Sequence, residues 1–212
     1  MKLKRLAFYC LAGLIAGCMP VVSLQPLFTK GTITFDEKLL GAWVDDVNKP
    51  GDSWEFARLE ADAVDRLPDE LKQDPNKVYR VNIRDGEGHK GSFVACLVKL
   101  ENRLFLDISP DMFPAGDKDV EKSKLLFNAF LFLRAHTFVR VDSIGEQLKL
   151  SLTDDESFEK LIQAEPKAVA HTTADDRLVL TASTEELQKF VTKYAADDRL
   201  FSNEQTLVRK SK

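Results

Sequence analysis

The chain contains little of the chemistry from which active sites are commonly built. Its 212 residues include only three histidines, and the Gly-x-Ser-x-Gly sequence that marks the nucleophile of many hydrolases is missing. His89 lies among acidic residues, His136 in an apolar stretch, and His171 ahead of an acidic turn. In a chain of this length each histidine could be grouped with many different serines and aspartates. The sequence therefore does not point to any particular Ser-His-Asp catalytic triad. We therefore interpret the protein as a non-enzyme that uses no cofactor.

Long apolar runs are also missing. Lys2, Lys4 and Arg5 precede an apolar core that extends from Leu6 to Ala16, whereas a helix needs about 20 residues to cross a bilayer. A basic start, a short apolar core and small residues before a cysteine are the layout of a secretory signal. We expect residues 1–17 to be a signal peptide. The apolar run is too short to form a permanent transmembrane helix.

The end of this leader reads Ile15-Ala16-Gly17-Cys18. It resembles the lipobox of bacterial lipoproteins, which has a branched apolar residue, two small residues and a cysteine. The resemblance implies cleavage before Cys18 and acylation of Cys18, which would then anchor residues 18–30 as a lipidated tether. Met19 in place of Asp after the cysteine favours, by the same resemblance, the outer membrane, with the protein facing the periplasm. The alternative is an ordinary cleaved signal that happens to contain a cysteine.

Cysteine usage and charge limit the partners of the mature chain. Cys10 lies in the leader and Cys18 in the lipobox, which leaves Cys96 without a disulfide partner, and its apolar neighbours predict a buried, inert thiol. Residues 1–17 hold three cations and no acids, so 27 Lys and Arg remain against 34 Asp and Glu, a net charge of −7. This charge disfavours nucleic acid as a partner.

Period-two alternation dominates the mature chain. Residues 78–84 place Tyr79, Val81 and Ile83 on one face, and residues 146–152 repeat the pattern with leucines. Further strands are predicted at 41–46, 53–59, 91–100, 103–109, 136–143 and 177–182. Polar turns at Glu101-Asn102 and Gly145 connect two predicted hairpins. We expect a single β-rich domain over residues 31–201, followed by a polar C-terminal tail over residues 202–212.

Two helices are predicted after these strands. Ser183 and Glu186 form a capping box ahead of an apolar stripe at Leu187, Phe190, Val191 and Tyr194. A second helix is expected from about 155 to 164, with Thr153 and Glu156 as its capping pair and Pro166 beyond its end. The acidic residues at its start are explained by the helix dipole.

The predicted fold is a curved antiparallel sheet or barrel of about eight strands with two to three added helices. Gly41-Ala42-Trp43 resembles the Gly-x-Trp opening of lipocalins and related calycin barrels. In those proteins a late arginine packs on the tryptophan, and the resemblance offers Arg177 or Arg199 for that role. More broadly, "SLQPLF", "FDEKLLGAW" and "LFLDISP" look like a group of uncharacterised bacterial lipoproteins, which implies anchoring without a known chemistry.

One loop imitates a nucleotide-binding motif. Residues 86–91 satisfy G-x-G-x-x-G by letter, but the motif requires a following helix, and an apolar strand follows instead. We interpret these glycines as part of a hairpin loop. His89, between Asp85 and Glu87, is interpreted as part of a solvated turn and not as a metal ligand.

The stretch "LLFNAFLFL" at residues 125–133 is the most apolar part of the mature chain. As a helix it would be about 14 Å long, too short for a bilayer core of about 30 Å. Two interpretations remain. Either its side chains plug the barrel or pack beneath the helices, or they form a ligand mouth or a surface for a partner or membrane. The residues concerned are Leu126, Phe127, Phe130 and Leu133.

Three functional hypotheses follow from the sequence. The first is a lipid-anchored, non-catalytic module that holds an apolar small molecule in its barrel. The second is a structural or assembly lipoprotein that docks on an envelope protein, and the third is a hydrolase of unrecognised type.

Overall fold

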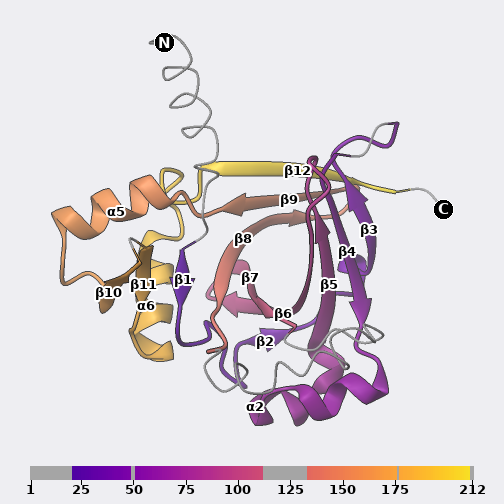
Figure 1. The fold of residues 1–212 in the computed structure, drawn as a ribbon, viewed down its shortest axis with the longest axis horizontal. Helices are drawn as coiled ribbons and strands as arrows, with labels where there is room; N and C mark the ends of the chain where they lie inside the picture. Colours follow the sequence, from indigo (N-terminus) through magenta and orange to yellow (C-terminus); the bar gives the residue numbers. More distant parts are fainter. Residues whose placement is uncertain (1–20, 49–50, 112–132, 176, 211–212) are drawn as a thin grey trace, which may run out of the picture.

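Eight antiparallel strands form a closed barrel in the computed structural model, which describes residues 21–48, 51–111, 133–175 and 177–210. Each strand pairs with the next along the chain, and the last pairs with the first (Figure 1). The strands are β3 (Gly41–Val44), β4 (Ser53–Arg58), β5 (Val78–Arg84), β6 (Lys90–Leu100), β7 (Arg103–Pro110), β8 (Thr137–Ile144), β9 (Gln147–Leu152) and β12 (Asn203–Arg209). The predicted β-rich, lipocalin-like fold class is confirmed.

The eighth barrel strand is not the one predicted. Residues 177–182 were expected in the main sheet, but β11 (Arg177–Leu180) belongs to a separate three-stranded sheet with β1 (Val22–Ser23) and β10 (His171–Ala174). The barrel is closed by β12, which lies in the segment predicted to be a polar tail. The prediction of a tail was wrong because only Leu207 of this strand is fully buried, which leaves almost no apolar alternation in the sequence.

The barrel interior is filled by the side chains predicted to share one face. Tyr79 and Val81 of β5 and Leu148 and Leu150 of β9 are fully buried there. They pack with Trp43 and with apolar residues of the other strands into one cluster. An eight-stranded barrel has an interior about wide enough for such side chains.

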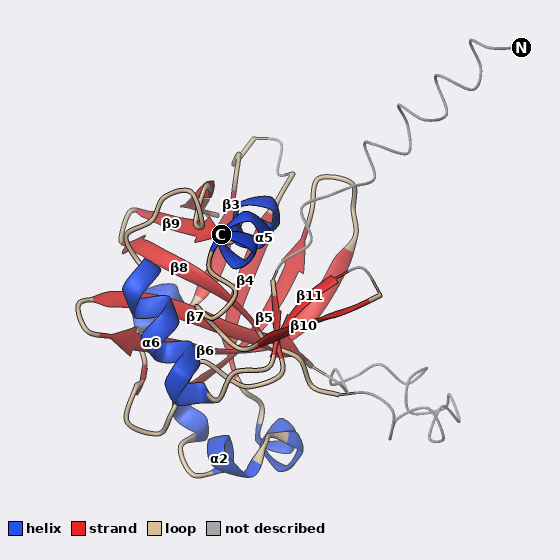
Figure 2. Cartoon of the chain, turned by 90° about the vertical axis from the view of Figure 1, so that its left-hand side faces the viewer, coloured by secondary structure: helices blue, strands red, loops and turns tan. Residues whose placement is uncertain are grey.

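A second apolar cluster covers the outside of β5 to β8. Its outer layer includes α5 (Asp155–Ala164) and α6 (Thr184–Tyr194), with β1 and β11 beside them, and α2 (Asp69–Lys72) lies near one end of the barrel (Figure 2). The rings of Phe158 in α5 and Phe190 in α6 lie 5.3 Å apart. Other short elements are β2 (Ile33–Thr34), which pairs with β6, and the 3-10 helices Glu37–Leu39, Ala61–Arg66 and Pro75–Lys77. Leu39 of the first of these helices packs in the interior cluster with Trp43.

The two predicted helices are present with the expected bounds, but one has a different cap. Ser183 and Glu186 form the predicted capping box of α6. At α5 the N-cap is Asp154, whose carboxylate accepts the Ser157 backbone N–H. Thr153, predicted as that cap, lies one residue too early, and its buried hydroxyl has no hydrogen-bond partner. None of the described helices is long and apolar enough to cross a membrane.

The segment predicted as a tether is part of the folded domain from Val21 onward. Val21, Leu27 and Phe28 are buried in the outer cluster, and Val22 pairs with Val179 of β11. The predicted boundary at residue 31 is therefore too late. The sequence shows no alternation here because these residues cross the barrel surface as an irregular strap.

Candidate functional site

The larger of the two cavities described below lies outside the barrel. It has a volume of about 780 Å³ and is bounded by the N-terminal segment, the α2 region and the residues that lead into β8. Its apolar walls are formed by Leu24, Pro26, Phe28, Ile33, Leu67 and Pro68. Its polar lining includes Lys30, Glu70, Arg134, His136 and Thr184. An apolar cavity of this size with a few polar groups is typical of small-molecule sites.

A buried carboxylate holds one wall of this cavity in place. Asp107 points outward from β7 and is 2 % exposed. It accepts hydrogen bonds from the Leu27 backbone N–H and from Nδ1 of His136, 2.7 Å away. Because the carboxylate has partners on both oxygens, its burial is compensated. The N-terminal wall is thereby fixed to β7.

The same wall has two further attachments. The backbones of Ser23 and His136 exchange two hydrogen bonds of 2.8 Å. At the start of α6, Thr184 Oγ1 donates to the Pro26 carbonyl and Gln188 Nε2 to the Leu27 carbonyl. His136 is thus a hydrogen-bonded residue of this wall.

Arg134 is the most exceptional polar residue in the lining. Its Nη1 is shielded from solvent and has no hydrogen-bond partner. Burial lowers the pKa of Arg134, and the nearby charge of Asp111 acts in the opposite direction. The other cation of the lining, Lys30, donates to Gln73 Oε1. Arg134 thus lines the cavity, and one nitrogen of its guanidinium has no hydrogen-bond partner.

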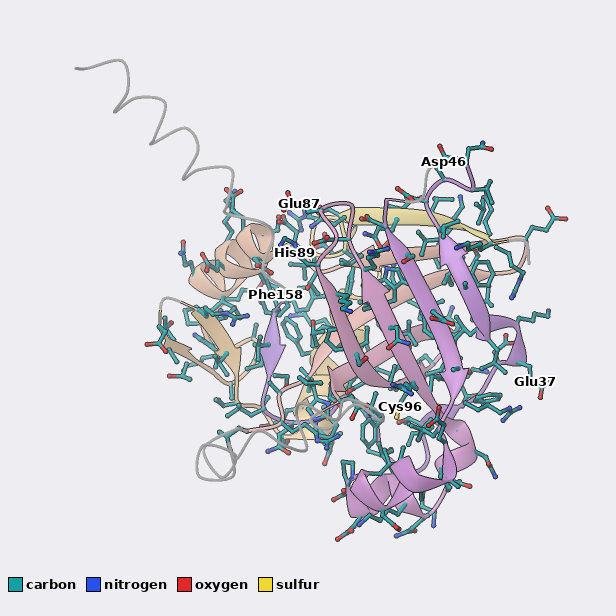
Figure 3. All side chains as sticks on the ribbon, turned by 45° about the vertical axis from the view of Figure 1, so that its right-hand side comes forward. Glu37, Asp46, Glu87, His89, Cys96 and Phe158 are labelled. Atoms are coloured by element: carbon teal, nitrogen blue, oxygen red, sulfur yellow. The ribbon has the colours of Figure 1, made fainter. Side chains whose placement is uncertain are left out.

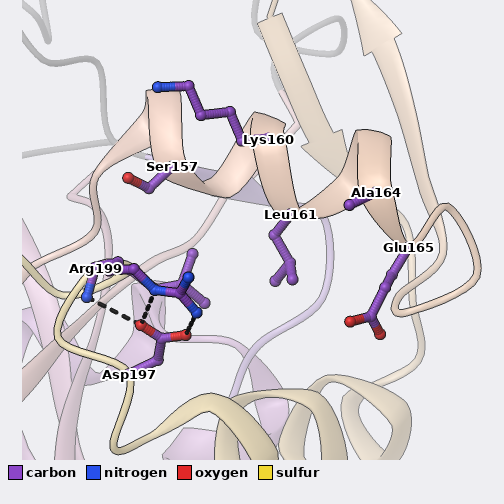
Figure 4. Close-up of a pocket in the computed structure, with 8 residues that line it drawn as sticks. Ser157, Lys160, Leu161, Ala164, Glu165, Asp197 and Arg199 are labelled. Atoms are coloured by element: carbon purple, nitrogen blue, oxygen red, sulfur yellow. Dashed lines mark hydrogen bonds and ion pairs between the residues drawn. The ribbon is translucent and has the colours of Figure 1, made fainter.

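A smaller cavity of about 310 Å³ lies between α5 and the loop after α6 (Figure 4). Arg199 in its lining is bound by Asp197 through two hydrogen bonds of 2.7 and 3.0 Å. Lys160, also in the lining, pairs with Glu156 at 2.7 Å. Since these cations already have acidic partners, this cavity offers less to a charged ligand.

The predicted hairpin loop around His89 is confirmed. Glu87 and His89 lie at the same end of the barrel as Asp46 (Figure 3). Asp85 accepts the backbone N–H groups of Glu87 and His89 and pairs with the imidazole at 2.8 Å. This contact raises the pKa of His89 and lowers that of Asp85. Within the described ranges no three acidic, His or Cys side chains form a metal-binding group.

Cys96 is buried on the outer face of β6, as predicted. It is 1 % exposed, and burial together with the nearby charge of Asp107 raises the pKa of its thiol. A thiol of raised pKa carries little of the nucleophilic thiolate at neutral pH. This geometry agrees with a packing role.

The predicted acylation site Cys18 lies outside the described residues. So do three of the four residues predicted as a ligand or partner surface, Leu126, Phe127 and Phe130. Leu133 is described and is 75 % exposed, so the interpretation in which it plugs the barrel or packs beneath the helices is wrong for this residue. It directly precedes Arg134, which the sequence analysis did not single out. An arginine at the end of an apolar run was the only available signal.

The arginine that packs on Trp43 is Arg209. Its guanidinium lies 4.3 Å from the Trp43 ring and donates to the carbonyls of Leu40 and Lys38 at 2.7 and 2.6 Å. Arg177 and Arg199 were the wrong candidates, because only β12 brings an arginine into register with Trp43. No family model, curated protein or solved structure matches the chain. The likeness to lipocalins therefore rests on the strand order and on Gly41, Trp43 and Arg209.

Proposed function

We propose that the protein is a lipid-anchored, non-catalytic binding module of the bacterial cell envelope that takes an apolar small molecule. The site is the 780 Å³ cavity between the N-terminal segment and α2. Anchoring through acylated Cys18, at the outer membrane, follows from the resemblance of residues 15–18 to a lipobox.

The cavity is the observation that carries this proposal. Apolar surface removed from water contributes roughly 25 cal/mol per Å² to binding, and six apolar side chains face the cavity. The barrel interior, where the ligand was first expected, is filled by Trp43, Trp54, Phe56 and Tyr79 with their neighbours. An apolar ligand is thus better accommodated on the outside of the barrel.

Docking on an envelope protein is the alternative, and exposed apolar residues favour it. Leu24 and Leu133 are 37 % and 75 % exposed. Large apolar side chains that are exposed on a protein surface often mark a protein–protein interface. Leu24 also lines the cavity, so one variant addresses both functions.

The test uses full-length protein purified from membranes. Native mass spectrometry, followed by titration with Nile red, is applied to the wild type, to Leu24→Asp and to a control, Val47→Asp. Val47 is 50 % exposed in the β3–β4 loop, so neither substitution disturbs a core. We expect a bound hydrophobic mass or Nile red fluorescence in the wild type and in Val47→Asp, and a clear loss in Leu24→Asp.

Two results would reject the cavity as the site. One is the absence of both a bound mass and Nile red binding in the wild type. The other is equal binding by Leu24→Asp and Val47→Asp. Co-purification of one protein at fixed stoichiometry, lost in Leu24→Asp, would instead establish the docking alternative.

A further inference from the structure

Apolar walls and an arginine occur together in the cavity described above. The walls include Phe28, Ile33 and Leu67, and Arg134 contributes a guanidinium whose Nη1 has no hydrogen-bond partner. A ligand that satisfies both features has an apolar body and an anionic end. Building on the proposed function, we propose that the ligand is a long-chain fatty acid whose carboxylate binds Arg134.

The state of Arg134 is the first argument. A guanidinium N–H that is shielded from water and has no acceptor is unfavourable, and turning the Arg134 side chain toward an acceptor in the cavity would remove that cost. Nη1 of Arg134 is in this state. Carboxylates match the fork of N–H donors on arginine and form short, charge-assisted hydrogen bonds with it.

The charge of the lining is the second argument. Lys30 and Arg134 are its two permanent cations, and Glu70 is its one acidic residue. Since the charge of Asp111 also acts on Arg134, this lining suits a head group with no more than one negative charge. A phosphate monoester, which carries nearly two charges at neutral pH, would meet too few cations here.

The size of the cavity is the third argument. A volume of about 780 Å³ lies within the range of pockets that enclose one small organic ligand. It suits a single acyl chain better than a two-chain phospholipid.

His136 limits where the head group can lie. Its Nδ1 donates to Asp107, which fixes the imidazole ring in the cavity wall. In the neutral ring Nε2 is then an acceptor, which offers no hydrogen bond to a carboxylate. The head group would therefore lie against Arg134, and the acyl chain along Phe28, Ile33 and Leu67.

The experiment separates the head group from the chain. Full-length protein purified from membranes is incubated with palmitate, with hexadecanol or with hexadecyl phosphate, and binding is measured by native mass spectrometry. The variants are Arg134→Gln, Arg134→Lys and a control, Arg84→Gln, because Arg84 is exposed at the end of β5. Circular dichroism confirms that each variant is folded.

We expect wild type and Arg84→Gln to bind palmitate at least about tenfold more tightly than hexadecanol, as charge-assisted hydrogen bonds allow. Arg134→Gln should lose this preference and keep its binding of hexadecanol, and Arg134→Lys should retain part of the preference. A preference that persists in Arg134→Gln, or equal binding of palmitate and hexadecanol by the wild type, would overturn the assignment of a carboxylate. Tighter binding of hexadecyl phosphate than of palmitate would also overturn it. If no apolar probe binds the wild type, the proposed function itself fails.

Discussion

Arg209 of β12 lies over the ring of Trp43 in β3, 4.3 Å from its centroid, where the last barrel strand meets the first. The arginine also donates to two carbonyls at the start of the barrel. We expect Arg209→Ala to lower the free energy of unfolding by about 2 kcal/mol, since a cation–π contact contributes about 0.5–1 kcal/mol and charged hydrogen bonds add to it. Urea unfolding followed by tryptophan fluorescence measures the change. The same urea midpoint in Arg209→Ala as in the exposed control Arg84→Ala would contradict this role.

The same arginine constrains Gly41. Gly41 has φ of +114°, and a Cβ at this position would lie 2.8 Å from Arg209 Nη1. Gly41→Ala should therefore cost about 1–3 kcal/mol through backbone strain and displacement of the guanidinium. A double-mutant cycle separates these two contributions. When Arg209→Ala is already present, Gly41→Ala should cost only the free energy of backbone strain, because no guanidinium has to be displaced. Strict additivity would show that the two residues are independent.

Asp107 is expected to be essential for the position of the N-terminal segment. The Asp107 carboxylate accepts from two donors, the Leu27 N–H and His136 Nδ1. In Asp107→Asn one of these donors faces the amide NH₂, which cannot accept a hydrogen bond. We predict a loss of about 2–4 kcal/mol, because a buried donor remains unpaired. Hydrogen exchange at the Leu27 amide should become faster than in the control Glu55→Gln, an exposed site on β4. Unchanged exchange at Leu27 would argue against this anchor.

Asp155 gives the protein a defined pH dependence. Burial, with the charges of Asp154 and Glu159, raises its pKa to about 6 from 3.8. The folded state then binds a proton more tightly than the unfolded state, so this residue makes stability fall as the pH rises from about 4 to 6. Asp155→Asn should stabilise the protein by about 1 kcal/mol at pH 7, a value reduced for solvent screening at this partly exposed site.

Thermal unfolding of Asp155→Asn at several pH values provides the measurement. Below pH 4 the carboxyl is protonated in both states, so the difference from wild type should disappear. The control is Glu146→Gln, an exposed acidic residue whose charge is not among those acting on Asp155. If Asp155→Asn raises the stability by the same amount at pH 3 and at pH 7, ionisation of Asp155 is excluded as the cause.

Cys18 is predicted to be the acylated residue. The match of residues 15–18 to a lipobox leads us to expect that Cys18→Ser accumulates as an uncleaved or soluble form, whereas the wild type partitions into membranes. Two or three acyl chains anchor a protein stably, at about 0.8 kcal/mol per buried methylene. Fractionation and intact mass measurement distinguish the forms. A Cys18→Ser protein that remains processed and membrane-bound would remove the basis for lipid anchoring.

Local patterns predicted much of the fold because they act within one element. Alternation placed Tyr79 and Val81 inside the barrel, and the capping box defined the start of α6 at Ser183. The arginine that packs on Trp43 could not be identified in this way. Choosing Arg209 over Arg177 requires the register between β3 and β12, and this register is set by closure of the barrel and not by a local sequence pattern.

The cavity was not predictable for a related reason. Leu24, Leu67 and Arg134 come from three distant parts of the chain and meet only after the N-terminal segment has crossed the barrel. The carboxylate that fixes this crossing, Asp107, lies in β7 together with Arg103 and Ser109. From the sequence alone its side chain could equally have faced solvent.

Closure by β12 sets the order in which this protein can acquire its native state. The strands that seal the barrel, at residues 41–44 and 203–209, are separated by nearly the whole chain. Pairing over such sequence distances is slow, because a long loop must close before the contact is made. During synthesis β3 is made well before β12, so one edge of β3 stays unpaired until β12 follows. That edge is then the place where wrong strand pairing and aggregation are most expected.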